Sequence, residues 1–481
     1  MNKSLTGLII LFAYFGILCL IGHFTGRKNS NDDFFRAGRR SPWFVVAFGM
    51  VGVSLSGVTF LSVSGSVAKD HFSYMELVLG NMAGYWVMAL VLLPLYYRLN
   101  LTSIYGYLNK RFGPASYRTG AFCFLLSRTV GASLRLFLVA VVLHNMVFKP
   151  LFPSFELPFA VTAFVSILLI WIYTCKGGIK TVVWTDTLQT LFLLFALAYF
   201  TITLPGTLDS SFSECLNTAR QNGLTQIFSN DSMFLKSFIS GMFLTLVMNG
   251  LDQDMMQKNL TCKDLRSARK NIFSFSILFA LTSFAFLILG AFLTLYVQKY
   301  LPQLEGDKVF PGVIEHLATP GAFIVFILGV VAAAYSSADS ALASLTTSYC
   351  VDFANIESKA PDQQVNYRRK VHIAFSILLF LVVCGFYQLG NNDVVWTLFK
   401  AMGYTYGPLL GLFAFGILLK RQVNDKMVPW IAIAAPLFSY VLNEFLASKN
   451  IHIGLAILLV NGLTCFGLCL VFSKKGSAAD F

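Results

Sequence analysis

A carboxylate and several hydroxyl groups lie within an apolar stretch at residues 332–340, which reads Ala-Ala-Ala-Tyr-Ser-Ser-Ala-Asp-Ser. A charge at bilayer depth is costly, so it is retained mainly where it meets a partner, a cavity or an ion. Small and hydroxyl side chains recur here at steps of three and four, at Ala333, Ser336, Ser337 and Ser340. This spacing predicts one helix face with Asp339 at its edge. Because that face offers only oxygen ligands, which suit hard cations such as sodium, the segment indicates an ion-driven transporter.

The composition predicts a membrane protein with all-α architecture. Of 481 residues, 56% are apolar and only 12% are charged, which lies outside the range of soluble globular proteins. Apolar runs of about 18 residues, the length that crosses about 30 Å of hydrocarbon, recur along the chain and indicate about 13 transmembrane helices. The expected spans are residues 5–23, 43–67, 74–97, 120–147, 158–174, 182–204, 234–251, 272–297, 322–349, 371–389, 394–419, 427–446 and 453–472. We expect the first to remain as a helix, because it lacks the basic leader and cleavage site of a signal peptide.

The basic residues predict the orientation of the chain in the membrane. The net charge is +13, and 25 of the 36 Lys and Arg residues fall in expected loops on one side. Cytoplasmic loops carry such an excess, so we expect the N-terminus outside and the C-terminus inside. This distribution accounts for the charge without a nucleic-acid partner. The nine cysteines show neither a disulfide framework nor metal-ligand spacing.

Two expected spans that lie five helices apart share small residues or residues that disfavour a continuous helix. The second has glycine or serine at five of the nine positions 49–57, and the seventh has Asn249 and Gly250 after Thr245. Because each unit would hold five helices, an odd number, the two units would insert in the membrane in opposite orientations. The pattern therefore predicts an inverted repeat of 5+5 helices, at 42–204 and 234–419, with broken helices that hold ion and substrate. Helix 1 and two helices at 427–473 would be peripheral, and residues 1–481 would form one transporter domain. The alternative is that the small residues only allow close helix packing.

Three motifs carry a resemblance to a known family. They lie at residues 54–60 (Ser-Leu-Ser-Gly-Val-Thr-Phe), at residues 177–186 (Gly-Gly-Ile-Lys-Thr-Val-Val-Trp-Thr-Asp) and at residues 333–352. With these motifs the sequence resembles the sodium:solute symporters, which include sugar, proline, sialic-acid and vitamin carriers. The likeness covers nearly the whole chain, from residue 33 to the eleventh helix. It implies a LeuT-type fold.

The resemblance also implies where sodium binds. One sodium would lie between the second and ninth helices, held by the carbonyls of Gly52, Leu55 and Ala333 and the hydroxyls of Ser336 and Ser337. Some members bind a second sodium, and the matching positions here are Asp186, Ser336 and Ser340. Asp339 stands where those members carry Ser or Thr, so it would strengthen cation binding or admit a proton instead. The alternatives are that Asp186 bonds nearby backbone and that Asp339 pairs with a basic residue of a neighbouring helix.

The sequence identifies the solute site less specifically than it identifies the sodium site. The pattern of the sugar carriers is absent, whereas sialic-acid carriers use hydroxyls on helix two and an arginine on helix four, as Arg135 or Arg128 would provide here. A guanidinium can bind a carboxylate bidentately, so either arginine is a candidate for the solute. The alternative is that the arginines pair within the protein, for example with Glu76 or Asp252. The expected hydroxyls are Ser54, Ser56 and Thr59. Residues at positions that line or gate the cavity in relatives are Tyr74, Asn81, Thr245 and Met248.

We therefore predict a sodium-coupled secondary active symporter of the cell membrane that imports a small polar organic solute, such as a carboxylate-bearing sugar acid. The alternatives are a proton-coupled symporter on the same fold and a solute sensor that does not transport. No nucleophile, base and metal cluster converge in the sequence, so we do not expect an enzyme. The expected partners are Na+, the solute and the lipid bilayer, with no obligatory protein partner.

Overall fold

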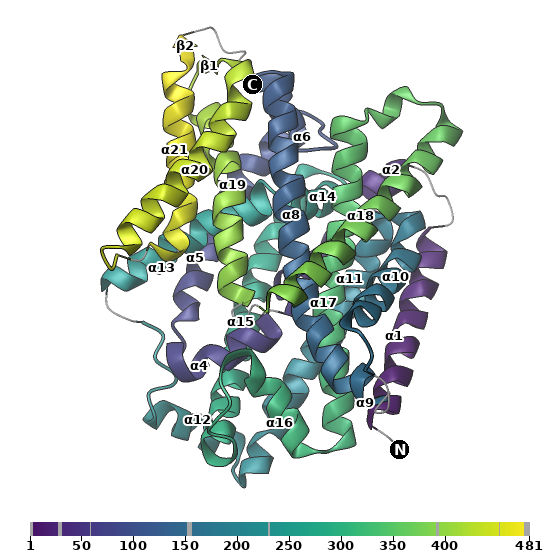
Figure 1. Ribbon diagram of the computed structural model, residues 1–481, viewed down its shortest axis with the longest axis vertical. Coiled ribbons are helices and arrows are strands. Elements are labelled where there is room, and N and C mark those ends of the chain that lie inside the picture. The colour runs from purple at the N-terminus through teal and green to yellow at the C-terminus, as the bar shows by residue number, and fades with distance from the viewer. Residues whose placement is uncertain are drawn as a thin grey trace.

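The fold is given by a computed structural model that describes residues 3–26, 31–57, 59–151, 156–228, 231–390, 394–451 and 453–475. Val58, which belongs to the motif at residues 54–60, lies outside the described residues. Long helices make up nearly all of the molecule, and most of them run along its longest axis (Figure 1).

The expected spans correspond to helices, with one short exception at the end of the chain. Within the described ranges, 11 helices are long and apolar enough to cross a membrane, and a bent pair brings the number to 12. The thirteenth expected span coincides with an apolar helix, Ile457–Val471, of 15 residues. At 1.5 Å per residue this helix is about 22 Å long, shorter than the roughly 30 Å of a hydrocarbon core.

The helices that form the bundle are α1 (Lys3–Thr25), α3 (Trp43–Ser54), α4 (Ser64–Asp70), α5 (Tyr74–Val87), α6 (Leu93–Arg98), α8 (Pro114–Leu143), α10 (Phe159–Gly177), α11 (Ile179–Thr203), α13 (Asp231–Thr245), α14 (Gln253–Leu260), α15 (Leu265–Tyr300), α17 (Pro320–Ser348), α18 (Pro361–Leu389), α19 (Val394–Leu418), α20 (Val428–Ala447) and α21 (Ile457–Val471). Shorter helices at the ends and in the loops are α2 (Asn31–Arg36), α7 (Gly106–Arg111), α9 (Lys149–Leu151), α12 (Phe212–Gln221) and α16 (Val309–Leu317). Two short strands, β1 (Arg421–Val423) and β2 (Ser473–Lys475), pair antiparallel.

The second membrane helix is broken where its small residues gather. Its helical hydrogen bonds end with the one from Leu55 N to Val51 O (2.9 Å), and a bond from Phe60 N to Ser56 O (3.1 Å) follows the break. Beyond it the chain forms a π-helical turn, η2 (Thr59–Val63), and continues as α4. The two halves meet at 62°. Carbonyls in such a break are released from the helix and are free to bind an ion.

The seventh membrane helix is interrupted near its end. α13 continues through a π-helical turn, η6 (Leu246–Gly250), and the helix restarts as α14. The Asp252 side chain caps α14 by accepting a hydrogen bond from the Asp254 amide (2.8 Å). A carboxylate at this position is favourable because the first amides of a helix have no backbone partner.

Glycines also bring neighbouring helices close together, as the packing alternative proposed. A Cβ atom on Gly49 would lie 3.0 Å from the Asp186 Cβ of α11. Three residues later, the Gly52 amide donates to Thr190 Oγ1 (3.0 Å). Both interpretations of the small residues therefore hold for the second helix, which is broken at one end and packed tightly on α11 along its length.

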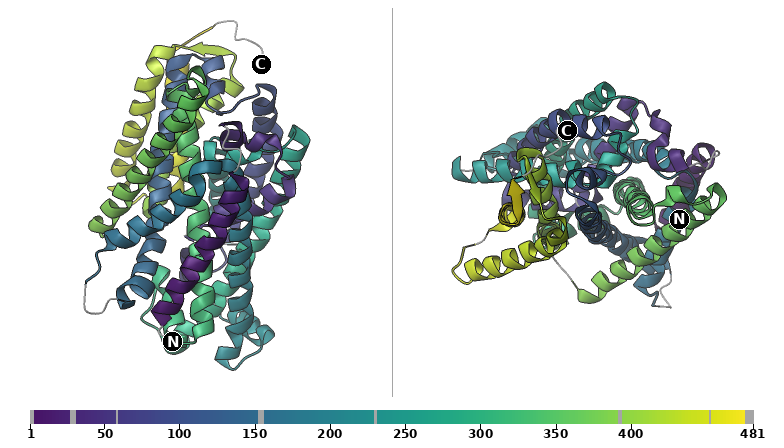
Figure 2. Two further views of the ribbon diagram at one scale, coloured as in Figure 1. Left: turned by 90° about the vertical axis from the view of Figure 1, so that its right-hand side faces the viewer. Right: turned by 90° about the horizontal axis from the view of Figure 1, so that it is seen from above.

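α17 lies at the centre of this arrangement, and it packs against α3, α8 and α11. Every residue of α17 from 329 to 348 is buried. α1 begins at the end of the molecule opposite the β1–β2 pair, as two perpendicular views show (Figures 1 and 2). The orientation of these ends relative to the cytoplasm stays a prediction from the charges.

Candidate functional site

The hydroxyl of Ser337 meets the unwound end of α3. Ser337 Oγ donates to the Val53 carbonyl oxygen (3.1 Å), so α17 contacts α3 within its last turn. Gly52 and Leu55 flank this carbonyl in the sequence, and Ala333 lies one turn before Ser337. All are buried. The structure therefore brings together the two helices between which a sodium is expected, with the Ser337 hydroxyl facing the Val53 carbonyl.

Ser336 points to a different helix. Its hydroxyl donates to Asp186 Oδ1 (3.0 Å) in α11. The other oxygen, Asp186 Oδ2, lies 2.7 Å from the ammonium nitrogen of Lys258 in α14. Both charged side chains are almost completely buried, with exposures of 1% for Lys258 and 0% for Asp186. Asp186 is thus bound by side chains of α14 and α17, and within the described ranges no hydrogen bond joins its carboxylate to nearby backbone.

Asp339 accepts hydrogen bonds from two hydroxyl groups and one backbone amide. Asp339 Oδ2 accepts hydrogen bonds from Tyr173 (2.8 Å) and from Thr185 (3.4 Å), and Oδ1 accepts one from the Ser340 amide (2.6 Å). Within the part of the chain that the structure describes, no basic side chain forms an ion pair with it. The alternative that Asp339 pairs with a basic residue of a neighbouring helix is therefore not seen among the described residues.

The two arginines of α8 have different surroundings. Arg128 forms ion pairs with Asp254 and with Asp252 (4.0 Å), as the alternative of internal pairing predicted. The hydroxyls of Ser340 and Tyr406 donate to the same two carboxylates. These groups join α8, α14, α17 and α19 in one buried network.

Arg135 lies two turns further along α8 and is only half-buried. Among the described residues it makes no ion pair or hydrogen bond, and its buried Nε is without a partner. It lies close to the break of the second helix, because Val139, one turn on, is the residue that a Cβ on Gly57 would meet first (2.5 Å). Among the described residues, Arg135 is therefore a cation without an ion-pair or hydrogen-bond partner, one turn before the residue of α8 that meets Gly57.

The remaining solute candidates surround the two breaks. When the Asn81 amide is oriented with its nitrogen toward the acceptors around it, it donates to Thr245 Oγ1 (3.0 Å) and to the Gly241 carbonyl (2.8 Å), which joins α5 to α13. Tyr74 and Met248 are partly buried on the same pair of segments. The hydroxyl residues of the second helix lie at its break or just after it, at Ser54, Ser56 and Thr59.

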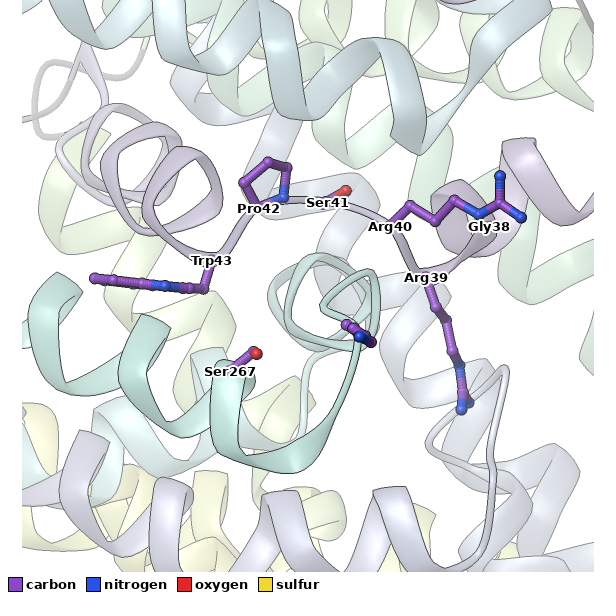
Figure 3. Close-up of a pocket in the computed structure, with 8 residues that line it drawn as sticks. Gly38, Arg39, Arg40, Ser41, Pro42, Trp43 and Ser267 are labelled. Carbon is purple, nitrogen blue, oxygen red and sulfur yellow. The ribbon is translucent and has the colours of Figure 1, made fainter.

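A separate hollow of about 490 Å³ opens at the start of α3 and contains none of these residues. It is lined by residues 38–43 together with Lys263 and Ser267. Arg39 and Arg40 point away from each other there (Figure 3). The adjacent start of α15 is already capped, because Asp264 accepts a hydrogen bond from the Ser267 amide (2.8 Å), which lowers the pKa of this carboxyl.

Comparison with known proteins decides the family. The sequence model of the sodium:solute symporter family matches residues 34–426. The chain belongs to this family. The symporter is 27% identical over 443 residues to the sodium/sialic acid symporter NanT of Aliivibrio fischeri, which covers 88% of this chain and 85% of that protein. It is 24% identical over 458 residues to the human sodium/iodide cotransporter, an alignment that covers 89% of this chain and 69% of that protein.

A solved structure confirms the fold. An outward-open Na+-coupled sialic acid symporter aligns with a TM-score of 0.81 at 22% identity, over 98% of this chain and 99% of the other. The symporter has a LeuT-type fold, as the broken helices predicted. It is a multi-pass protein of the cell membrane that couples the movement of a small polar solute to sodium.

Three residues that bind the predicted site residues were not predicted from the sequence: Lys258, Asp254 and Tyr173. Lys258 lies between the expected spans 234–251 and 272–297, so the sequence predicts it in a cytoplasmic loop. The structure instead buries it inside the bundle. One signal was present. Asp254 and Lys258 are four residues apart, so they lie on one face of a helix that begins directly after the break.

Proposed function

We propose that the symporter imports a small solute with a carboxylate, of the sialic acid class, and that Arg135 binds the carboxylate. The observation that carries this proposal is the difference between the two arginines of α8. Arg128 is neutralised by two carboxylates, whereas Arg135 has no partner among the described residues. An uncompensated guanidinium in a membrane is costly, and a bound anion would remove that cost.

The position of Arg135 supports this role. It lies about 10 Å along α8 from Arg128, at the level where α8 packs on the break of the second helix. With the N-terminus outside, this is the outward side of the Arg128 network. The related proteins support an anionic solute as well, because one carries sialic acid and the other iodide, as their names state.

Sodium would couple to the solute through the second helix. A sodium between α3 and α17 would bind the carbonyls of Gly52, Leu55 and Ala333 and the hydroxyl of Ser337. It would thereby fix the break whose hydroxyls, at Ser54, Ser56 and Thr59, face the solute. Each ligand then favours the arrangement that binds the other, and this coupling is reciprocal. Release of sodium into a cytoplasm with little sodium completes import.

The proposal is tested by uptake of radiolabelled sialic acid into proteoliposomes. We expect Arg135→Gln to raise the KM for sialic acid at least about tenfold, because a hydrogen-bonded charge pair contributes about 1.5–3 kcal/mol. Arg118→Gln is the matched control, since Arg118 lies on the same helix and is exposed. It should leave the KM unchanged.

Two results would reject the proposal. The first is an unchanged KM for Arg135→Gln. The second is a wild-type protein that takes up no sialic acid but carries a neutral sugar. A protein that binds sialic acid yet shows no exchange of external label for internal solute would be a sensor, not a carrier.

A further inference from the structure

An oxygen-rich cluster lies between α11 and α17, where Asp186, Asp339 and Ser340 are expected to bind a second sodium. The structure surrounds the two carboxylates with the hydroxyls of Ser336, Tyr173 and Thr185, and all of these residues are buried, whereas the Ser340 hydroxyl donates to Asp254 of α14. Such a cluster of carboxylates and hydroxyls attracts a hard cation. A cation is already present, and it belongs to the chain itself.

That cation is the ammonium of Lys258. Its nitrogen lies 2.7 Å from Asp186 Oδ2, and the side chain is 1% exposed. The residue reaches this place because the seventh helix breaks and α14 turns into the bundle, with Gln253 to Leu260 all buried. Buried lysine is rare unless it is paired, so the ion pair with Asp186 accounts for its position.

We propose that the Lys258 ammonium is a built-in replacement for a second sodium. It carries the same single positive charge and binds the same carboxylate that a sodium at Asp186 would need. A sodium bound to Asp186 would lie within a few ångströms of the ammonium, and like charges so close in a buried site repel strongly. The position therefore holds either the lysine or a sodium, and not both.

The consequence is a fixed stoichiometry for sodium. The symporter binds one sodium, between α3 and α17, and Lys258 keeps α11, α14 and α17 connected in the way that a second ion would. This inference deepens the proposed sodium site and does not depend on which solute is carried.

The test counts bound sodium ions with radioactive sodium as the only ligand. Purified full-length protein in lipid nanodiscs is titrated in a background of potassium. We expect one sodium per wild-type chain, two per chain for Lys258→Met, which leaves Asp186 without its ammonium, and one for Lys258→Arg. One ion in both the wild type and Lys258→Met, or two in the wild type, would overturn the inference.

A folding defect in Lys258→Met is informative as well. If sodium takes the place of the lysine, this variant melts at a lower temperature than the wild type in potassium and regains stability in sodium. A variant that stays unfolded in saturating sodium, while Lys258→Met combined with Asp186→Asn folds, would also overturn the inference. Failure of the α3–α17 site would lower both counts equally, so the difference of one ion between variant and wild type still decides.

Discussion

Ser336 and Ser337 are adjacent in α17, yet they bind different helices. Consecutive residues of a helix point about 100° apart, so Ser337 bonds the Val53 carbonyl of α3 and Ser336 bonds Asp186 of α11. Ser337 is therefore the hydroxyl that belongs to the proposed sodium site, and Ser336 belongs to the cluster around Lys258.

This division predicts unequal effects of removing a hydroxyl. We expect Ser337→Ala to raise the sodium concentration for half-maximal uptake about tenfold, which corresponds to about 1.4 kcal/mol for one lost oxygen ligand. Ser344→Ala is the matched control, because Ser344 is also buried in α17 but donates to Ala341 of its own helix (3.0 Å). The measurement is the sodium dependence of initial uptake rates. Equal shifts in the two variants would show that the effect is not specific to the site.

At the residue scale, helical spacing indicated hydroxyl groups on α17, whereas the charge partners could not be predicted from the sequence. The serines of α17 could be selected by their helical spacing, although the single face that this spacing predicted is divided in the structure, since Ser336 bonds α11 and Ser337 bonds α3. The partner of Asp186 could not, because Lys258 lies 72 positions away in the chain and its burial depends on the break after η6. Arg128 and Arg135 likewise look equivalent in sequence, and only the carboxylates of α14 distinguish them.

At the scale of elements, the proposed sodium site depends on the contact between α3 and α11. Gly52 donates its amide to Thr190, and a Cβ at this position would also lie 3.2 Å from the Thr190 Cα. Any side chain must therefore push the two helices apart. That movement would displace the Gly52 carbonyl, which is one of the proposed sodium ligands.

We expect Gly52→Ala to destabilise the protein by about 1–3 kcal/mol through overpacking and to weaken sodium binding. Gly467→Ala is the control, because nothing lies within 4 Å of a Cβ at that position of α21. It should be neutral or slightly stabilising, since alanine favours a helix more than glycine does. Thermal unfolding with and without sodium measures both effects. Equal melting temperatures for the two variants would contradict the tight packing of α3 on α11.

The expected spans and the observed helices agree in their middles and differ at their ends. α15 begins at Leu265 and α18 at Pro361, whereas the expected spans begin at 272 and 371. Hydropathy detects only the part of a helix that lies in lipid, and these helices extend into polar segments beyond it. The break of the second helix was predicted because glycine and serine cluster there, but the 62° angle depends on tertiary packing.

At the scale of the whole molecule, the basic loops predict which end faces the cytoplasm. Ser213, on α12, and Ser358, after α17, are both exposed, and the orientation places Ser213 outside and Ser358 inside. We expect an impermeant maleimide to label Ser213→Cys in intact cells, and Ser358→Cys only after permeabilisation. The signal of the wild type corrects for its nine cysteines. The reverse pattern would show that the orientation is wrong.

The most direct test of the account is sodium-driven accumulation of radiolabelled sialic acid in proteoliposomes. With high sodium outside and potassium inside, we predict that wild-type protein concentrates the label above its external level, that a protonophore does not prevent this, and that Ser337→Ala does so only at much higher sodium. Accumulation that is equal with potassium outside, or that collapses with the protonophore, would contradict coupling through sodium held between α3 and α17.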